Sequence, residues 1–109
     1  MKKLLILSII FPSLVSSQNW DQVSSFIADG RHHPITFAND NYGFVISGTY
    51  MDDVYKYDKL NDTWIQLQDI PFVGRGYAYG VTVNNKAYIG FGSTSSGQYP
   101  TDWWEYDMD

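Results

Sequence analysis

The feature that most constrains the fold of this chain is an internal repeat with a period of 44 residues. A tryptophan, a Gly-Arg pair and a single glycine all recur at that one spacing. The matched positions are Trp20 and Trp64, Gly30-Arg31 and Gly74-Arg75, and Gly48 and Gly92. A period of this length indicates that one small supersecondary unit is copied along the chain and buries its faces against its neighbours.

The residues between these markers predict four short strands per repeat. Phe44-Val45-Ile46 does not alternate apolar with polar residues, which favours a strand covered on both faces. Asp40-Asn41 and Asn84-Asn85 predict hairpin turns with positive φ, since Asn and Asp tolerate that conformation. The predicted strands are 33–39, 42–47, 53–57 and 63–67 in the first repeat, and 77–83, 86–91 and 102–106 in the second.

The second repeat contains an insertion. Asp53–Asp58 resembles Asp102–Asp107, but the spacing of these segments is 49 residues, so five extra residues follow Gly92. The resulting loop, Ser93–Thr101, is rich in Ser, Gly and Tyr. Loops on a rigid scaffold carry function more often than the scaffold itself, so this loop is a candidate contact region.

Composition excludes several classes of function. The chain has a formal net charge of −5 and no basic cluster beyond Lys2-Lys3, which argues against a nucleic-acid partner. It has no cysteine, which excludes disulfides, thiolate-bound zinc and a thiol nucleophile within these residues. Aromatic residues make up 17% of the chain, as is typical of short strands with large buried side chains.

Residues 1–17 predict a secretory signal peptide. Lys2-Lys3 precedes the apolar run Leu4–Phe11, and small residues lead to a cleavage site before Gln18. A bilayer span needs about 20 apolar residues, so the run is too short to anchor the chain. We therefore expect a secreted or periplasmic protein with no membrane span after cleavage.

The ordered motifs resemble the kelch repeat, in which an apolar strand ending in a double glycine is followed by a Tyr-Asp pair and a tryptophan. The double glycine is degenerate here. The counterparts are Phe44–Gly48 (ending Ser47-Gly48), Tyr57-Asp58 and Trp64 in the first repeat, and Tyr88–Gly92 (ending Phe91-Gly92) and Tyr106-Asp107 in the second. The resemblance implies an all-β fold made of β-propeller blades, each a four-stranded antiparallel meander.

The resemblance also implies a division of the chain. Residues 18–24 would be an outer strand, residues 30–67 a blade, and residues 74–109 an incomplete blade. Propellers close with about four to eight blades, and this chain holds fewer than two kelch repeats. We therefore expect an N-terminal fragment of a longer propeller, with self-assembly as the alternative if the reading frame stops after Asp109.

Four residues are candidates for ligand binding: Arg31, Arg75, Tyr77 and Tyr99. The two arginines precede the innermost strands, where a guanidinium fork suits a carboxylate or another anion. Alternatively, each arginine binds backbone carbonyls or an aspartate of its neighbour. Tyr99 lies in the inserted loop and is the expected exposed contact. Of Trp103-Trp104, at least one side chain should be buried, because neighbours on a strand face opposite ways.

The sequence predicts no metal site and no cofactor. His32-His33 would point to opposite faces of a strand and so would not bind one ion together. The acidic and amide residues Asp52, Asp53, Asp58, Asn61 and Asp62 lack EF-hand spacing and suit turns.

We expect a binding module for a protein or carbohydrate ligand, with no catalytic motif evident in the sequence. The family resemblance also implies an alternative, part of a periplasmic sugar epimerase or mutarotase similar to N-acetylneuraminate epimerase. In that case Arg31 and Arg75 would hold the sugar carboxylate. A purely structural repeat without a ligand is the third reading.

Overall fold

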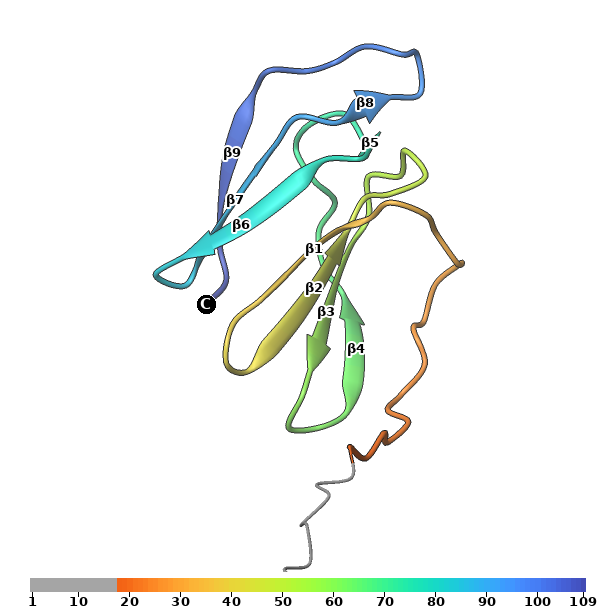
Figure 1. The fold of residues 1–109 in the computed structure, drawn as a ribbon, viewed down its shortest axis with the longest axis vertical. Helices are drawn as coiled ribbons and strands as arrows, with labels where there is room; N and C mark the ends of the chain where they lie inside the picture. The colour runs from red at the N-terminus through yellow and green to blue at the C-terminus, as the bar shows by residue number, and fades with distance from the viewer. Residues whose placement is uncertain (1–17) are drawn as a thin grey trace, which may run out of the picture.

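The computed structural model describes residues 18–109, so the predicted signal peptide at residues 1–17 lies outside the described part. The described part is all-β, as expected, and consists of three antiparallel sheets (Figure 1). Within residues 18–109 no helix is long and apolar enough to cross a bilayer.

The first sheet contains four strands in chain order, and the second contains three. The first sheet is β1 (Ile35–Ala38), β2 (Tyr42–Ile46), β3 (Val54–Asp58) and β4 (Thr63–Gln66). The second sheet is β6 (Tyr79–Val83), β7 (Lys86–Gly90) and β9 (Trp103–Asp107), and β5 (Arg75–Gly76) pairs with β8 (Ser93–Thr94) in a short separate ladder. The seven strands predicted within the two repeats form with ends shifted by two residues at most.

The strand expected at residues 18–24 is absent, so that prediction is wrong for this segment. Its last residue, Ser24, contacts the first sheet at Asp62 and Trp64. The Ser24 amide donates to Asp62 Oδ1 at 2.8 Å, and the Trp64 indole donates to the Ser24 carbonyl at 3.1 Å. A strand needs a continuous ladder to a neighbouring strand, and these bonds run instead through side chains.

The repeat extends to the backbone conformation. Left-handed residues recur 44 positions apart, with φ of 82° at both Gly48 and Gly92. A Cβ on Gly48 would lie 2.8 Å from the Pro34 Cα, and one on Gly92 would lie 2.8 Å from the Ala78 nitrogen. Because Pro34 and Ala78 are also 44 positions apart, the same strand-to-strand contact explains both glycines.

The two hairpin turns differ, although both were expected to use positive φ. Asn84 and Asn85 have φ of 49° and 63°, as expected. Asp40-Asn41 is absent from the positive-φ residues, so the prediction is wrong there. In that turn the Asn39 side chain accepts bonds from the amides of Asn41 and Tyr42, at 3.0 and 2.8 Å, and so closes the loop without a left-handed residue.

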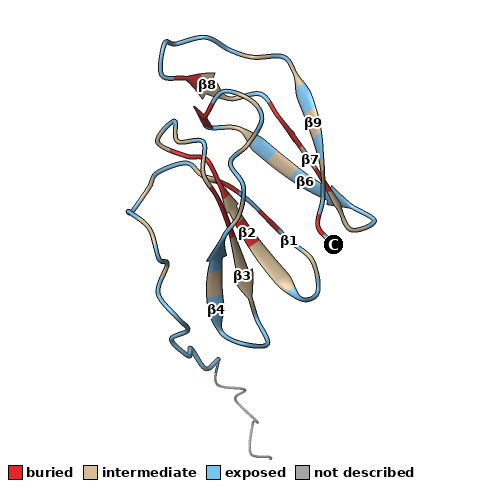
Figure 2. Cartoon of the chain, turned by 180° about the vertical axis from the view of Figure 1, so that it is seen from behind, coloured by how far each residue is buried: buried red, intermediate tan, exposed pale blue. Residues whose placement is uncertain are grey.

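The core lies between the two sheets, where β1 packs against β6 (Figures 1 and 2). A Cβ on Gly80 of β6 would lie 2.9 Å from Ile35 Cγ2 and 3.2 Å from Phe37 Cδ1, so the glycine allows the close approach. The buried core residues are Ile35, Phe37, Phe44, Ile46 and Val54 from the first sheet and Ala87, Ile89 and Met108 from the second unit.

Candidate functional site

Arg31 and Arg75 occupy equivalent positions and make equivalent contacts. Each guanidinium binds both oxygens of one aspartate: Arg31 binds Asp53 at 2.5 and 2.9 Å, and Arg75 binds Asp102 at 2.9 and 3.1 Å. Each also donates to a backbone carbonyl of the left-handed pair that ends the second strand of its repeat, Ser47 at 3.0 Å for Arg31 and Phe91 at 3.3 Å for Arg75.

Both guanidiniums are buried. The side chain of Arg31 is 4% exposed, and that of Arg75 is 2% exposed. The Arg75 guanidinium also lies over the Phe72 ring, 4.7 Å from its centroid. The aspartate belongs to the same repeat as its arginine rather than to a neighbour, and the fork that would receive a ligand carboxylate is occupied in both cases.

The arginines lower the pKa of their partners. A hydrogen bond from Arg75 and a second from the Trp104 indole, 2.6 Å from Asp102 Oδ2, lower the pKa of Asp102 from 3.8 to about 2. The hydrogen bond from Arg31 likewise lowers the pKa of Asp53. Charge-assisted bidentate bonds of this kind favour the ionised carboxylate. Each aspartate therefore remains ionised at neutral pH, and its bonds to the arginine fix the start of the third strand of its repeat.

Tyr77 and Tyr99 lie together on the wall of an open hollow of about 550 Å³ at the β5–β8 end of the second sheet. Tyr99 is 80% exposed and Tyr77 is 54% exposed. No residue of the lining carries a charge at neutral pH. The full lining is Tyr77, Tyr79, Phe91, Gly92, Ser93, Tyr99, Pro100 and Thr101.

Two aromatic residues of the hollow were missed by the sequence reasoning. Tyr79 and Phe91 were assigned only to strands. Phe91 has φ of 63° and stands where a kelch double glycine would have its first glycine. An aromatic residue in place of that glycine is unusual, and this substitution is the sequence signal that could have singled out Phe91.

The tryptophans of β9 face opposite ways, but neither is fully buried. Trp103 is 49% exposed and packs edge-on against Phe91, with ring centroids 4.9 Å apart. Trp104 is half-buried and stacks on Phe72 at 5.0 Å. The expectation that one of the pair is buried is therefore wrong. Each tryptophan ring packs against one phenylalanine ring, which covers only part of the tryptophan surface.

The histidines also differ from expectation. The Nδ1 atoms of His32 and His33 lie 3.0 Å apart, because His33 has φ of 51° and lies before β1 rather than in a strand. The His33 ring stacks on the Tyr77 ring, with centroids 3.8 Å apart. Among residues 18–109, no group of three or more His, Asp or Glu side chains is arranged to hold a metal ion.

Of the acidic residues expected in turns, Asp58 serves one, whereas Asp53 pairs with Arg31. Asp58 accepts bonds from the amides of Leu60 and Asn61, at 2.9 and 3.1 Å, and so caps the β3–β4 turn. Asp52 accepts a bond from the Gly74 amide at 2.7 Å and thereby ties the linker between the repeats to the first sheet.

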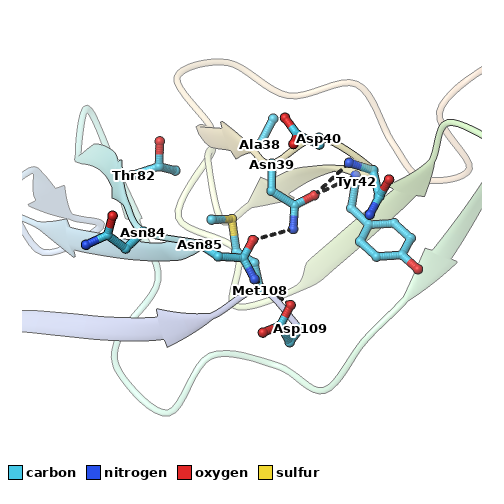
Figure 3. A pocket seen from close by; sticks show the side chains of 10 residues that line it. Ala38, Asn39, Asp40, Tyr42, Thr82, Asn84, Asn85, Met108 and Asp109 are labelled. Atoms are coloured by element: carbon cyan, nitrogen blue, oxygen red, sulfur yellow. Dashed lines mark hydrogen bonds between the residues drawn. The ribbon is translucent and has the colours of Figure 1, made fainter.

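A second hollow, of about 420 Å³, lies at the opposite end of the strands, between the β1–β2 and β6–β7 turns (Figure 3). It is polar. The Asn39 side chain donates to Asn85 Oδ1 at 2.7 Å, and the Asn85 side chain donates to Asp109 Oδ1 at 2.5 Å (Figure 3). These amides bond to one another across the two units, so this hollow is held by contacts that join the sheets.

No protein-family model matches the chain, and no curated protein matches it significantly.

Proposed function

We propose that this chain is a binding module, and that the hollow formed by Tyr77, Tyr79, Phe91 and Tyr99 contacts a protein or carbohydrate ligand. The observation that carries the proposal is the gathering of exposed aromatic side chains around one uncharged hollow. Aromatic rings supply a large contact area at low entropic cost, and the tyrosine hydroxyls supply hydrogen bonds at the rim.

The scaffold in this proposal is a secreted kelch-type propeller. Two sheets with the same strand order, the same left-handed pair and the same Arg–Asp bond pack face to face. In a propeller, successive blades are related in this way around a central axis, with their innermost strands side by side. Here β1 and β6 are those strands, and residues 30–67 and 74–109 are the blades.

The epimerase or mutarotase alternative receives less support. It assigns Arg31 and Arg75 to a sugar carboxylate, and both guanidiniums are buried and bound to aspartates. Binding of a ligand carboxylate by either guanidinium would require breaking its two hydrogen bonds to the aspartate and exposing a buried arginine side chain.

The test uses the full chain as it is expressed, applied to a glycan array and to a peptide-display library. We expect the chain to retain selectively a neutral glycan or a peptide that packs against the exposed aromatic side chains of the hollow. Tyr99→Ala and Tyr77→Ala should each weaken that binding at least tenfold, about 1.4 kcal/mol or more. Trp20→Ala removes an aromatic side chain that is 92% exposed outside the hollow, and it should bind like the parent chain.

Equal losses for the Trp20 variant and the tyrosine variants would show that the hollow is not the contact site. Hydrolysis or epimerisation of a retained glycan would support the enzymatic alternative instead.

A further inference from the structure

We infer that His32 and His33 together form a metal-ion site, with Cu²⁺ as the preferred ion. The two side chains face each other, and their Nδ1 atoms lie 3.0 Å apart. Both residues are exposed, so an ion can reach the pair from solvent. Neither histidine lines the aromatic hollow, and the inference does not depend on the proposed ligand.

The separation of the two nitrogens suits a single ion. Metal ions bind imidazole nitrogen at about 2.0 to 2.1 Å, so two nitrogens 3.0 Å apart subtend about 90 to 97° at a shared ion. Neighbouring ligands in square-planar or tetragonal coordination subtend about 90°, whereas tetrahedral ligands subtend about 109°. The pair therefore suits Cu²⁺ or Ni²⁺ better than Zn²⁺. Of these ions, Cu²⁺ binds a given set of nitrogen ligands most tightly.

Contacts on both sides hold the pair in place before any ion binds. The His32 amide donates to Thr49 Oγ1 at 3.1 Å, and the His32 carbonyl accepts a bond from the Thr49 amide at 3.1 Å. The His33 ring stacks on the Tyr77 ring, with centroids 3.8 Å apart. Ligands that are already positioned lose less conformational entropy on binding, which favours capture of an ion by only two side chains.

The internal repeat indicates that the turn carrying the two histidines belongs to the fold. Tyr77 is the 44-residue counterpart of His33 and has φ of 61°, close to the 51° of His33. Gly76 is the counterpart of His32, so the second repeat has the same left-handed residue before its innermost strand but no nitrogen ligands. The turn that places the two histidine rings side by side therefore forms without an ion.

The chemistry of the pair allows the exchange of a proton for an ion. A hydrogen bond between two Nδ1 atoms needs a proton on one nitrogen and a lone pair on the other. A shared ion needs both Nδ1 lone pairs, so each neutral ring then carries its proton on Nε2.

The surroundings of the pair leave the ion open to solvent. The neighbouring cation, Arg31, binds both oxygens of Asp53, and this carboxylate offsets its charge. Within residues 18–109 no third histidine or acidic side chain joins the pair in a metal-binding group, so water completes the coordination of the ion.

The experiment titrates Cu²⁺ alone into the full chain, purified without a histidine tag, and follows binding by isothermal titration calorimetry. The sequence contains no cysteine and no histidine other than these two, so every imidazole ligand must come from the pair. We expect the parent chain to bind one ion, and Ni²⁺ and Zn²⁺ to bind more weakly than Cu²⁺. His32→Ala should weaken Cu²⁺ binding by about tenfold or more, because one of two protein ligands is lost.

Two further variants separate ligation from packing and from general attraction of cations. His33→Phe keeps an aromatic ring against Tyr77 but removes the nitrogen, so it should lose Cu²⁺ affinity to the same extent as His32→Ala. Asp29→Asn removes an exposed carboxylate shortly before the pair and should bind Cu²⁺ like the parent chain. Equal affinity in the parent, His32→Ala and His33→Phe would overturn the inference.

Pulsed electron paramagnetic resonance of the Cu²⁺-loaded chain counts the imidazole ligands directly. We expect two for the parent and one for each histidine variant. A parent spectrum with fewer than two imidazoles would show that the 3.0 Å contact is a hydrogen bond only, and would overturn the inference. Tyr99→Ala should bind Cu²⁺ like the parent while losing the proposed ligand, which separates failure of this inference from failure of the proposed function.

Discussion

Replacing Gly48 by alanine tests whether the repeated contact at the end of β2 holds the first sheet together. The residue has φ of +82°, a left-handed conformation that an L side chain adopts at a cost of about 1 kcal/mol. The new methyl would lie 2.8 Å from the Pro34 Cα and 2.9 Å from the Pro34 nitrogen. Both are backbone atoms of a rigid residue, so they cannot rotate away, and overpacking of this kind costs about 1 to 3 kcal/mol.

Together these effects should lower the free energy of unfolding by about 2 to 4 kcal/mol. Gly97→Ala supplies the matched control. Gly97 has φ of +77°, and no atom lies within 4 Å of a Cβ added there, so only the conformational cost of about 1 kcal/mol applies. Gly92→Ala should behave like Gly48→Ala, because its methyl would meet the Gly76 carbonyl and the Ala78 nitrogen.

The assay is urea unfolding followed by tryptophan fluorescence, with the slope of the transition compared between variants. The difference between the Gly48 and Gly97 variants isolates the steric contribution. Equal losses for these two variants would refute the reasoning, because they would show that the contact between Gly48 and Pro34 does not constrain the folded chain.

Three further outcomes are expected. Phe37→Ala should lower the free energy of unfolding by about 3 to 5 kcal/mol in the same urea assay, because it removes a buried aromatic ring and leaves a cavity between the two sheets. A loss below about 1 kcal/mol would contradict that packing. The pKa of Asp102 is lowered to about 2, so this carboxylate stabilises the fold above its ordinary pKa of 3.8, and the contribution disappears as the pH falls through about 2. Because the Asp102 side chain is 38% exposed, we expect solvent screening to reduce this contribution to about 1 kcal/mol. The urea midpoint of the parent chain should therefore fall between about pH 5 and pH 2, and this fall should be absent from Asp102→Asn. An equal fall in Asp102→Asn would exclude this carboxylate as the cause. Tyr99→Ala should change the free energy of unfolding by less than about 0.5 kcal/mol, since the Tyr99 side chain is 80% exposed. A larger loss of stability in thermal or urea unfolding would show that Tyr99 has a structural role.

Local pattern was sufficient to predict most of the strands. The apolar run Phe44–Ile46, the asparagine turn at 84–85 and the aligned Tyr-Asp pairs each depend on residues close in the chain. A strand and its turn are determined by alternation and φ preference over a few residues, so these elements appear within two residues of their predicted ends.

Predictions that required knowledge of a distant neighbour failed. The segment 18–24 was aligned as a strand from its tryptophan, but strand formation also requires a ladder partner, and Ser24 instead bonds to Asp62. The two histidines were placed on opposite faces because they were assumed to lie in a strand. The left-handed φ of His33 turns its ring onto Tyr77.

The candidate site was likewise predictable only in part from the sequence. Sequence identified Tyr77 and Tyr99 as candidates but had no means of bringing Tyr79 and Phe91 to the same hollow, because that depends on the path of the inserted loop over β6 and β7. The equivalence of Arg31 and Arg75 was visible in the repeat. Their burial against Asp53 and Asp102 was not, because side-chain pairing across 22 and 27 residues follows from strand register.

By itself, then, the sequence determined the repeat, the all-β class and the order of strands, because these depend on composition and on spacing along the chain. Only the tertiary structure decided which faces are buried, which charges are paired and which aromatic side chains surround an open hollow. The physical reason is that burial and pairing depend on which surfaces meet. Val81 and Phe37 occupy equivalent places in the repeat and differ in exposure because only Phe37 is covered by a neighbouring sheet.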